Sequence, residues 1–290
     1  MATTHATSES TMPVWRKCSP FCDKLKECPE HHELLQAIVN CTDQLGHLSN
    51  LDTLKNCIEK YQNMGWDKND VVPDPVAANR LPLIHWAASL GKCNALEWML
   101  SNGFESTTTF GPQSQSALHR TVLYLYKSRP KFTTKELKPK FRKICVLLSN
   151  LTHQFDSDNG TPLHLAANLL TTSETRLVFF QTAIEVMVGL TQDMSFTDKT
   201  ETLDAVNSDG NTALHILANV GEKIKVDHCR TAIGALLAAN ADKNIRNAKD
   251  QTPLEIAMQK GYDSVIEELT KVNIRVFLYK WKVQMPVRVN

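Results

Sequence analysis

The chain has 290 residues, of which 22% are charged and 42% hydrophobic, and its formal net charge at pH 7 is +1. This is the composition of an ordinary globular protein, and so small a net charge excludes a general electrostatic attraction to nucleic acid or to anionic membranes. No run of apolar residues approaches the roughly 18 that a membrane span requires, and the first residues lack the basic-then-apolar pattern of a signal peptide.

The eight cysteines are scattered along the chain, and several fall inside helical patterns. Such usage is typical of reduced, buried thiols, so we expect a cytoplasmic or nuclear protein. The cysteines within helical patterns are Cys41, Cys57, Cys93, Cys145 and Cys229.

Residues 1–30 are predicted to form an amino-terminal tail that is either disordered or a small Cys/His-rich element. Its cysteines and histidines follow the spacing Cys-x3-Cys-x5-Cys-x3-His, which could supply a tetrahedral zinc site. The first pair is not the common Cys-x2-Cys and no second pair follows, so reduced thiols packed on the first helices are the alternative. Zinc is therefore the one cofactor that the sequence suggests, with Cys18, Cys22, Cys28 and His32 as its ligands.

Residues 31–72 contain two runs of apolar residues at helical spacing, which predicts a pair of helices. The runs are followed by Gly65-Trp66-Asp67-Lys68-Asn69, a sequence typical of a turn. The apolar positions are Leu34, Leu35, Ile38 and Val39, then Leu51, Leu54, Ile58 and Tyr61.

A short pattern recurs down the rest of the chain, clearest as Asn-Gly-Thr-Pro-Leu-His-Leu-Ala-Ala at residues 159–167. Its threonines are predicted to cap helices, and its prolines to occupy the first helical turn, where the missing N–H costs nothing. Small alanines in the pattern let a neighbouring helix approach closely. Weaker copies lie at residues 80–88, which include Pro82, and at 116–122, 210–218 and 251–257.

This pattern resembles the ankyrin repeat, a unit of about 33 residues with the signature Thr-Pro-Leu-His-x-Ala. The resemblance covers at least residues 79–271 and implies an all-α solenoid of about six helix-turn-helix units, which binds partners on its concave face. The signature histidines, His85, His119, His164 and His215, are expected to hydrogen-bond from one unit to the next. The expected units are 31–72, 79–110, 113–156, 159–207, 209–247 and 250–272, followed by an extended segment at 273–290.

The spacing of the units departs from the family. The signature positions lie 34 residues apart from 85 to 119, but 45 from 119 to 164, 51 from 164 to 215 and 40 from 215 to 255. Extra residues in such repeats generally form loops. We therefore expect insertions between helices at 127–137, an extended hairpin at 191–208 and a longer link at 220–227.

Aromatic residues stand where the ankyrin hairpins usually carry small ones. Exposed rings are typical anchors for a partner, and with carboxylates beside them they could form a cage for a methylated lysine. The alternative is that each ring covers the hydrophobic seam between units. The predicted partner-binding residues of this part are Trp66, Asp67, Phe104, Glu105, Phe110 and Tyr124.

Two charged segments are further candidates. Residues 127–143 are basic with Phe132 and Phe141 interleaved, so they could bind an acidic peptide or nucleic acid, or form a solvated helix face. The acidic residues of 191–204 could meet a basic tail such as a histone, or simply favour solubility. The basic patch comprises Lys131, Lys135, Lys138, Lys140, Arg142 and Lys143.

The last residues alternate apolar and polar from 279 to 289, which predicts an extended edge strand containing Pro286. A lone amphipathic strand is not stable in water, so it is expected to pair with a partner, with another copy or with a following domain, or to cap the last repeat. Tyr279 and Trp281 are its predicted binding residues. We expect the chain to be part of a larger protein.

No phosphate-binding loop, dinucleotide fingerprint, nucleophile elbow or His-Glu-x-x-His motif is present in the sequence. We therefore expect a non-catalytic protein–protein adaptor or scaffold, possessing no membrane span and able to join a larger complex. The alternative is a chromatin-associated reader or a nucleic-acid-contacting module, and a third hypothesis is an enzyme whose active domain lies after residue 290.

Overall fold

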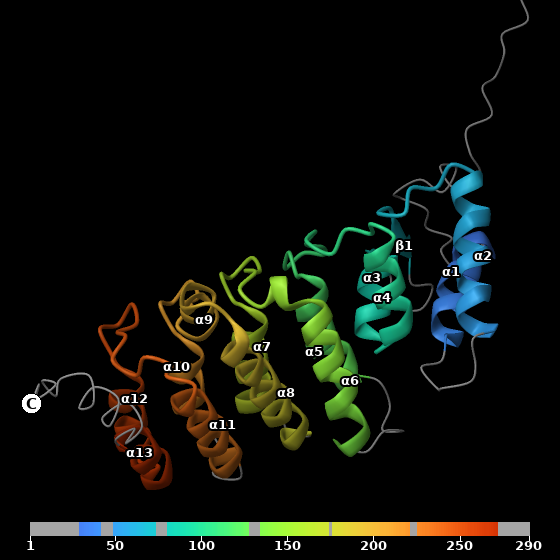
Figure 1. Ribbon diagram of the computed structural model, residues 1–290. Coiled ribbons are helices and arrows are strands. Elements are labelled where there is room, and N and C mark those ends of the chain that lie inside the picture. The colour runs from blue at the N-terminus through green and yellow to red at the C-terminus, as the bar shows by residue number, and fades with distance from the viewer. Residues whose placement is uncertain are drawn as a thin grey trace, which may run out of the picture. The chain divides into compact units, whose positions relative to one another are not determined.

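The computed structural model describes residues 29–41, 49–73, 80–127, 134–173, 176–220 and 225–271. These residues are mostly helical, as expected for an all-α chain, and they belong to two compact units, Met1–Ser106 and Thr107–Asn290 (Figure 1). The predicted tail before residue 29 and the predicted carboxy-terminal strand lie outside the described residues. No helix in the described ranges is long and apolar enough to cross a membrane.

The first unit contains two helix pairs and a small sheet. Helices α1 (Pro29–Asn40) and α2 (Ser49–Asn63) form the pair expected in residues 31–72, and α3 (Leu83–Ser89) packs on α4 (Cys93–Ser101). Between the pairs, β1 (Val71–Pro73) runs antiparallel to β2 (Arg80–Pro82), which the sequence did not predict. Pro82 is therefore not in the first helical turn: it ends β2 and precedes α3, with φ −54° and ψ 150°.

The second unit stacks helix pairs in two layers. Its first layer consists of α5 (Ala117–Lys127), α7 (Pro162–Thr172), α10 (Ala213–Ala218) and α12 (Pro253–Lys260), each in contact with the next. Its second layer consists of α6 (Thr134–Leu147), α8 (Leu177–Leu190), α11 (Val226–Ala238) and α13 (Asp263–Thr270), in contact in the same order. Figure 1 shows the pairs α7/α8, α10/α11 and α12/α13 side by side.

The core lies between the two layers. Leu163, Ala166 and Ala167 of α7 are buried, and the alanines leave room for the adjacent helices. Helix α8 is apolar nearly all round because it contacts α6 on one side, α11 on the other and α7 in front. Helix α10 is buried over its whole length, with Leu214 only 1% exposed.

The expected insertions have different structures. The insertion expected at 127–137 is shorter, because α5 includes Lys127 and α6 begins at Thr134, and the link expected at 220–227 corresponds to residues 219–225 between α10 and α11. The expected extended hairpin at 191–208 is wrong: a 3-10 turn, η4 (Thr191–Asp193), leads into a helix, α9 (Phe196–Leu203). Ser195 caps this helix by accepting a hydrogen bond from the Asp198 N–H at 3.2 Å. This N-cap stabilises a helix where a hairpin strand was expected.

Truncating Leu214 tests this packing. Leu214→Ala is expected to lower the free energy of unfolding by about 2–5 kcal/mol, because it removes buried methyl groups and leaves a cavity. Met258→Ala on α12 is the control, since that side chain is 61% exposed and should change stability by under about 0.5 kcal/mol. Equal effects of the two changes in urea unfolding would contradict the core assignment.

Candidate functional site: a polar groove along the first helices

A hydroxyl–histidine cap begins three of the first-layer helices: Ser116–His119 before α5, Thr161–His164 at α7 and Thr212–His215 at α10. Thr161 Oγ1 lies 2.8 Å from His164 Nδ1, and the Thr161 N–H donates to the same nitrogen at 3.2 Å. Because Nδ1 accepts that bond, Nε2 carries the proton and donates to the Asn211 carbonyl at 2.9 Å. The imidazole thus joins the start of α7 to the loop before α10.

The histidines of the two neighbouring first-layer helices, α5 and α10, make the same hydrogen bond to the loop that follows. His119 Nε2 lies 3.0 Å from the Gly160 carbonyl, and His215 Nε2 lies 3.0 Å from the Gln251 carbonyl. These contacts confirm the expected hydrogen bonds between units for His119, His164 and His215. In α12, Glu255 takes the histidine's place: it accepts from the Thr252 N–H at 2.8 Å and pairs with Arg246.

Burial keeps these imidazoles neutral. Desolvation lowers the pKa of His119 to about 4, although its bond to the Gly160 carbonyl acts in the opposite direction. The pKa values of His164 and His215 are lowered for the same reason. With both ring nitrogens engaged, the histidines act as structural bridges rather than as bases.

Hydrogen bonds within and between the loops that precede α10 and α12 also fix the positions of these loops. The Oδ1 atom of Asn207 accepts from the N–H groups of Asp209 and Asn211, and Asn247 repeats this turn forty residues later. The Ala248 N–H donates to the Asp209 carbonyl at 2.9 Å. Gly210 has a φ of 71°, and a Cβ there would lie 2.7 Å from the Ala248 nitrogen, so the close approach of the loops depends on this glycine.

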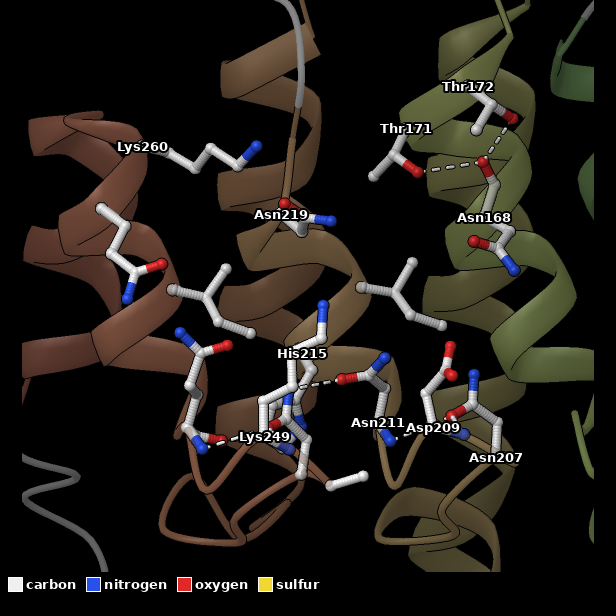
Figure 2. A pocket seen from close by; sticks show the side chains of 16 residues that line it. Asn168, Thr171, Thr172, Asn207, Asp209, Asn211, His215, Asn219, Lys249 and Lys260 are labelled. Atoms are coloured by element: carbon white, nitrogen blue, oxygen red, sulfur yellow. Dashed lines mark hydrogen bonds between the residues drawn. The ribbon is translucent and has the colours of Figure 1, made fainter.

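A polar groove with a volume of about 590 Å³ follows α7, α10 and α12 and their loops (Figure 2). Asn168 of α7, Asn219 directly after the end of α10 and Gln259 of α12 line it, each four residues after the signature histidine or its replacement Glu255. Within the described ranges, none of their carboxamides has a hydrogen-bond partner. The remaining lining residues are Thr171, Thr172, Asn207, Asp209, Asn211, His215, Ile216, Asn247, Ala248, Lys249, Gln251, Ile256 and Lys260.

The aromatic residues expected as exposed anchors are largely buried. Trp66 is 4% exposed and Phe104 is 5% exposed, so the prediction that they present rings to a partner is corrected in favour of the alternative, that they cover a hydrophobic seam. The Phe104 ring centroid lies 6.1 Å from that of Trp98, and the Lys68 ammonium lies 5.8 Å from it. Both rings stabilise the first unit.

The remaining predicted partner residues are dispersed. Asp67 and Glu105 are exposed. Asn69 lies between them: its side-chain Oδ1 accepts from the Glu105 N–H, and its own backbone N–H donates to the Asp67 carboxylate. Phe110 is half-buried in an isolated bridge with Gln115. The side chain of Tyr124 and residues Tyr279 and Trp281 lie outside the described residues.

The basic segment, residues 127–143, has exposed positive charges on α6, but its Phe141 ring is not exposed for a nucleic-acid base to stack on. Lys138, Arg142 and Lys143 are exposed on α6, and the Lys138 ammonium lies 3.8 Å from the Glu185 carboxylate. Lys140 is half-buried, while Lys131 and the side chain of Lys135 lie outside the described residues. Phe141 is 1% exposed and packs edge-on against Phe179, so it cannot stack on a base.

The predicted zinc ligands Cys18, Cys22 and Cys28 and the side chain of His32 also lie outside the described residues. In the part of the chain that the structure describes, no three potential metal ligands come together. The cysteines expected to be buried thiols, Cys41, Cys57, Cys93, Cys145 and Cys229, are buried. Burial raises the pKa of Cys57 to about 11 and that of Cys229 to about 12, which keeps both protonated at neutral pH.

No protein-family model matches the chain, and no curated protein is significantly similar to it. The function is therefore inferred from the groove itself, whose lining residues come from α7, α10, α12 and the loops at 207–211 and 247–251.

Phe104→Ala distinguishes a structural ring from a binding anchor. It is expected to lower the free energy of unfolding by about 3–5 kcal/mol, because the ring is buried against Trp98. Glu105→Ala, which removes an exposed neighbour, is the control. An unchanged denaturation curve for Phe104→Ala would mean that the ring is not part of the core.

The histidine bridges predict a pH dependence of stability. Above pH 6.5 the imidazole of His119 is neutral in both states; as the pH falls towards 4, only the unfolded chain takes up the proton. The full free energy of unfolding is therefore present above pH 6.5. Between pH 6.5 and 4 it falls by about 1.4 kcal/mol per pH unit for such a histidine. His119→Gln removes the titrating group, so urea unfolding between pH 7.5 and 4.5 should give a shallower slope. An identical slope would contradict the neutral bridge.

Proposed function

We propose that the chain is an ankyrin-type repeat protein that recognises a protein partner without catalysing a reaction. The two-layer stack of helix pairs, the recurring caps that pair a serine or threonine with a histidine, and the bridges from each of these histidines to the next loop support this proposal. Five buried thiols support a location in the cytoplasm or nucleus.

The observation that carries the proposal is the row of unpartnered carboxamides in the groove. The loops and helix starts around them use their hydrogen-bonding groups internally, whereas Asn168, Asn219 and Gln259 turn theirs to solvent from equivalent positions. A partner that pairs with them loses little freedom in the receptor, because the bridged frame is already ordered.

A catalytic function finds little support in the same groove. His215 is its one imidazole, and both of its ring nitrogens are engaged in the bridge. The other polar lining groups are amides, hydroxyls, one carboxylate and two ammonium groups, which suit binding better than proton transfer. The alternative of a chromatin reader or nucleic-acid-contacting module loses its aromatic platform, since Trp66, Phe104 and Phe141 are buried.

A bulky charge in the groove tests the proposal. When the chain is crosslinked to its partners in a cell lysate, Asn219→Arg should no longer capture the partner. The new side chain fills the groove beside α10, the middle one of its three helices. Gln192→Arg is the matched control, since Gln192 is an exposed amide in η4, outside the groove. Partners retained by the control and lost by Asn219→Arg are the expected result. The same set of partners on both variants would contradict a role for the groove.

A further inference from the structure

The three groove carboxamides occupy the same position, four residues after the signature histidine or Glu255, in three successive first-layer helices. Packed helices lie about 8–10 Å apart, whereas an extended chain advances about 3.3 Å per residue. A segment that crosses α7, α10 and α12 therefore brings about every third residue to one of these amides, and about seven residues span all three. The interval of the amides thus matches an extended peptide.

We propose that the groove binds an extended peptide segment of the partner, which pairs its backbone with Asn168, Asn219 and Gln259 and places an acidic residue beside Lys249 and Lys260. This inference rests on the proposed function and specifies the ligand of that site. Figure 2 shows Asn168 and Asn219 on adjacent helices, with Lys249 at the loop end of the groove and Lys260 towards the other end.

An extended segment fits the chemistry of the groove better than a helix does. A carboxamide is both a donor and an acceptor, so it can pair with the N–H and the C=O of a backbone. A helical ligand uses these groups internally and would leave the receptor amides without partners. The apolar lining is small: Ile216 and Ile256 are each 8% exposed, so the groove lacks the broad apolar strip that an amphipathic helix requires.

Charges along the groove give the segment a polarity. Asp209 and Lys249 occupy equivalent positions in successive loops, and Lys260 lies at the end of α12. In the described part of the chain, the carboxylate of Asp209 and the two ammonium groups have no ion-pair partner. An acidic ligand residue is therefore favoured near α12 and is disfavoured near Asp209.

The defined probe is a displayed library of unconstrained twelve-residue peptides, selected on the full chain. Selected peptides, remade synthetically, should carry Asp or Glu towards one end. Titration calorimetry should give about three- to tenfold weaker binding for each of Asn168→Ala, Asn219→Ala and Gln259→Ala, which is the usual contribution of one hydrogen bond. All three side chains are exposed, and melting curves will verify that the variants fold.

Further variants of the chain and of the peptide test which groups contact each other. The double variant Asn150→Ala/Gln192→Ala removes exposed amides outside the groove and should leave affinity unchanged. N-methylation of the peptide bond opposite Asn219 should weaken binding to the wild type and remove the difference between wild type and Asn219→Ala. The double variant Lys249→Glu/Lys260→Glu should prefer peptides in which the acidic residue is replaced by lysine.

Failures of the two proposals are distinguishable. Peptides that bind all the amide variants equally would overturn the extended-segment inference alone. It would also be overturned if no peptide is selected while a captured protein is lost on Asn219→Arg, because the groove would then bind a folded surface. If no peptide is selected and no captured protein depends on the groove, both proposals fail.

Discussion

The hydrogen bond from a histidine Nε2 to the carbonyl of the following loop is the constraint on which the second unit depends. It requires a buried, neutral imidazole whose Nδ1 is held by the cap of its own helix, as in Thr161–His164. One side chain thus fixes a helix start, a tautomer and the position of the next loop. Because the bond recurs at His119, His164 and His215, the loops and first helices keep a common register.

The groove is a consequence of that register. Residues four positions after the signature histidine, or after Glu255 in its place, line the groove from α7, α10 and α12, and the loops at 207–211 and 247–251 form one border. Such order comes from local bonds within each unit and from contacts with its neighbours, as in repeat proteins generally. The groove can therefore be rigid even though its own amides make few internal contacts.

Much of the fold could be predicted from the sequence, because the repeated unit carries its own signals. Threonine before proline predicted the starts of α7 and α12, and the equivalent histidines predicted the bridges. The hairpin expected at 191–208 was wrong because spacing alone cannot distinguish an inserted strand pair from a helix capped at Ser195. Trp66 and Phe104 stand at hairpin positions, but which rings become buried depends on packing that no single motif encodes. The amide row was visible in the sequence at equal distances from the signature, although nothing local marked it as a surface.

Hydrogen exchange of backbone amides in the full chain, alone and saturated with a captured partner or a selected peptide, tests the central claim most directly. If the groove on α7, α10 and α12 is the binding site, added protection should concentrate in residues 207–219 and 247–260. Protection confined to α6, to α9 or to the first unit, with those residues unchanged, would contradict the account.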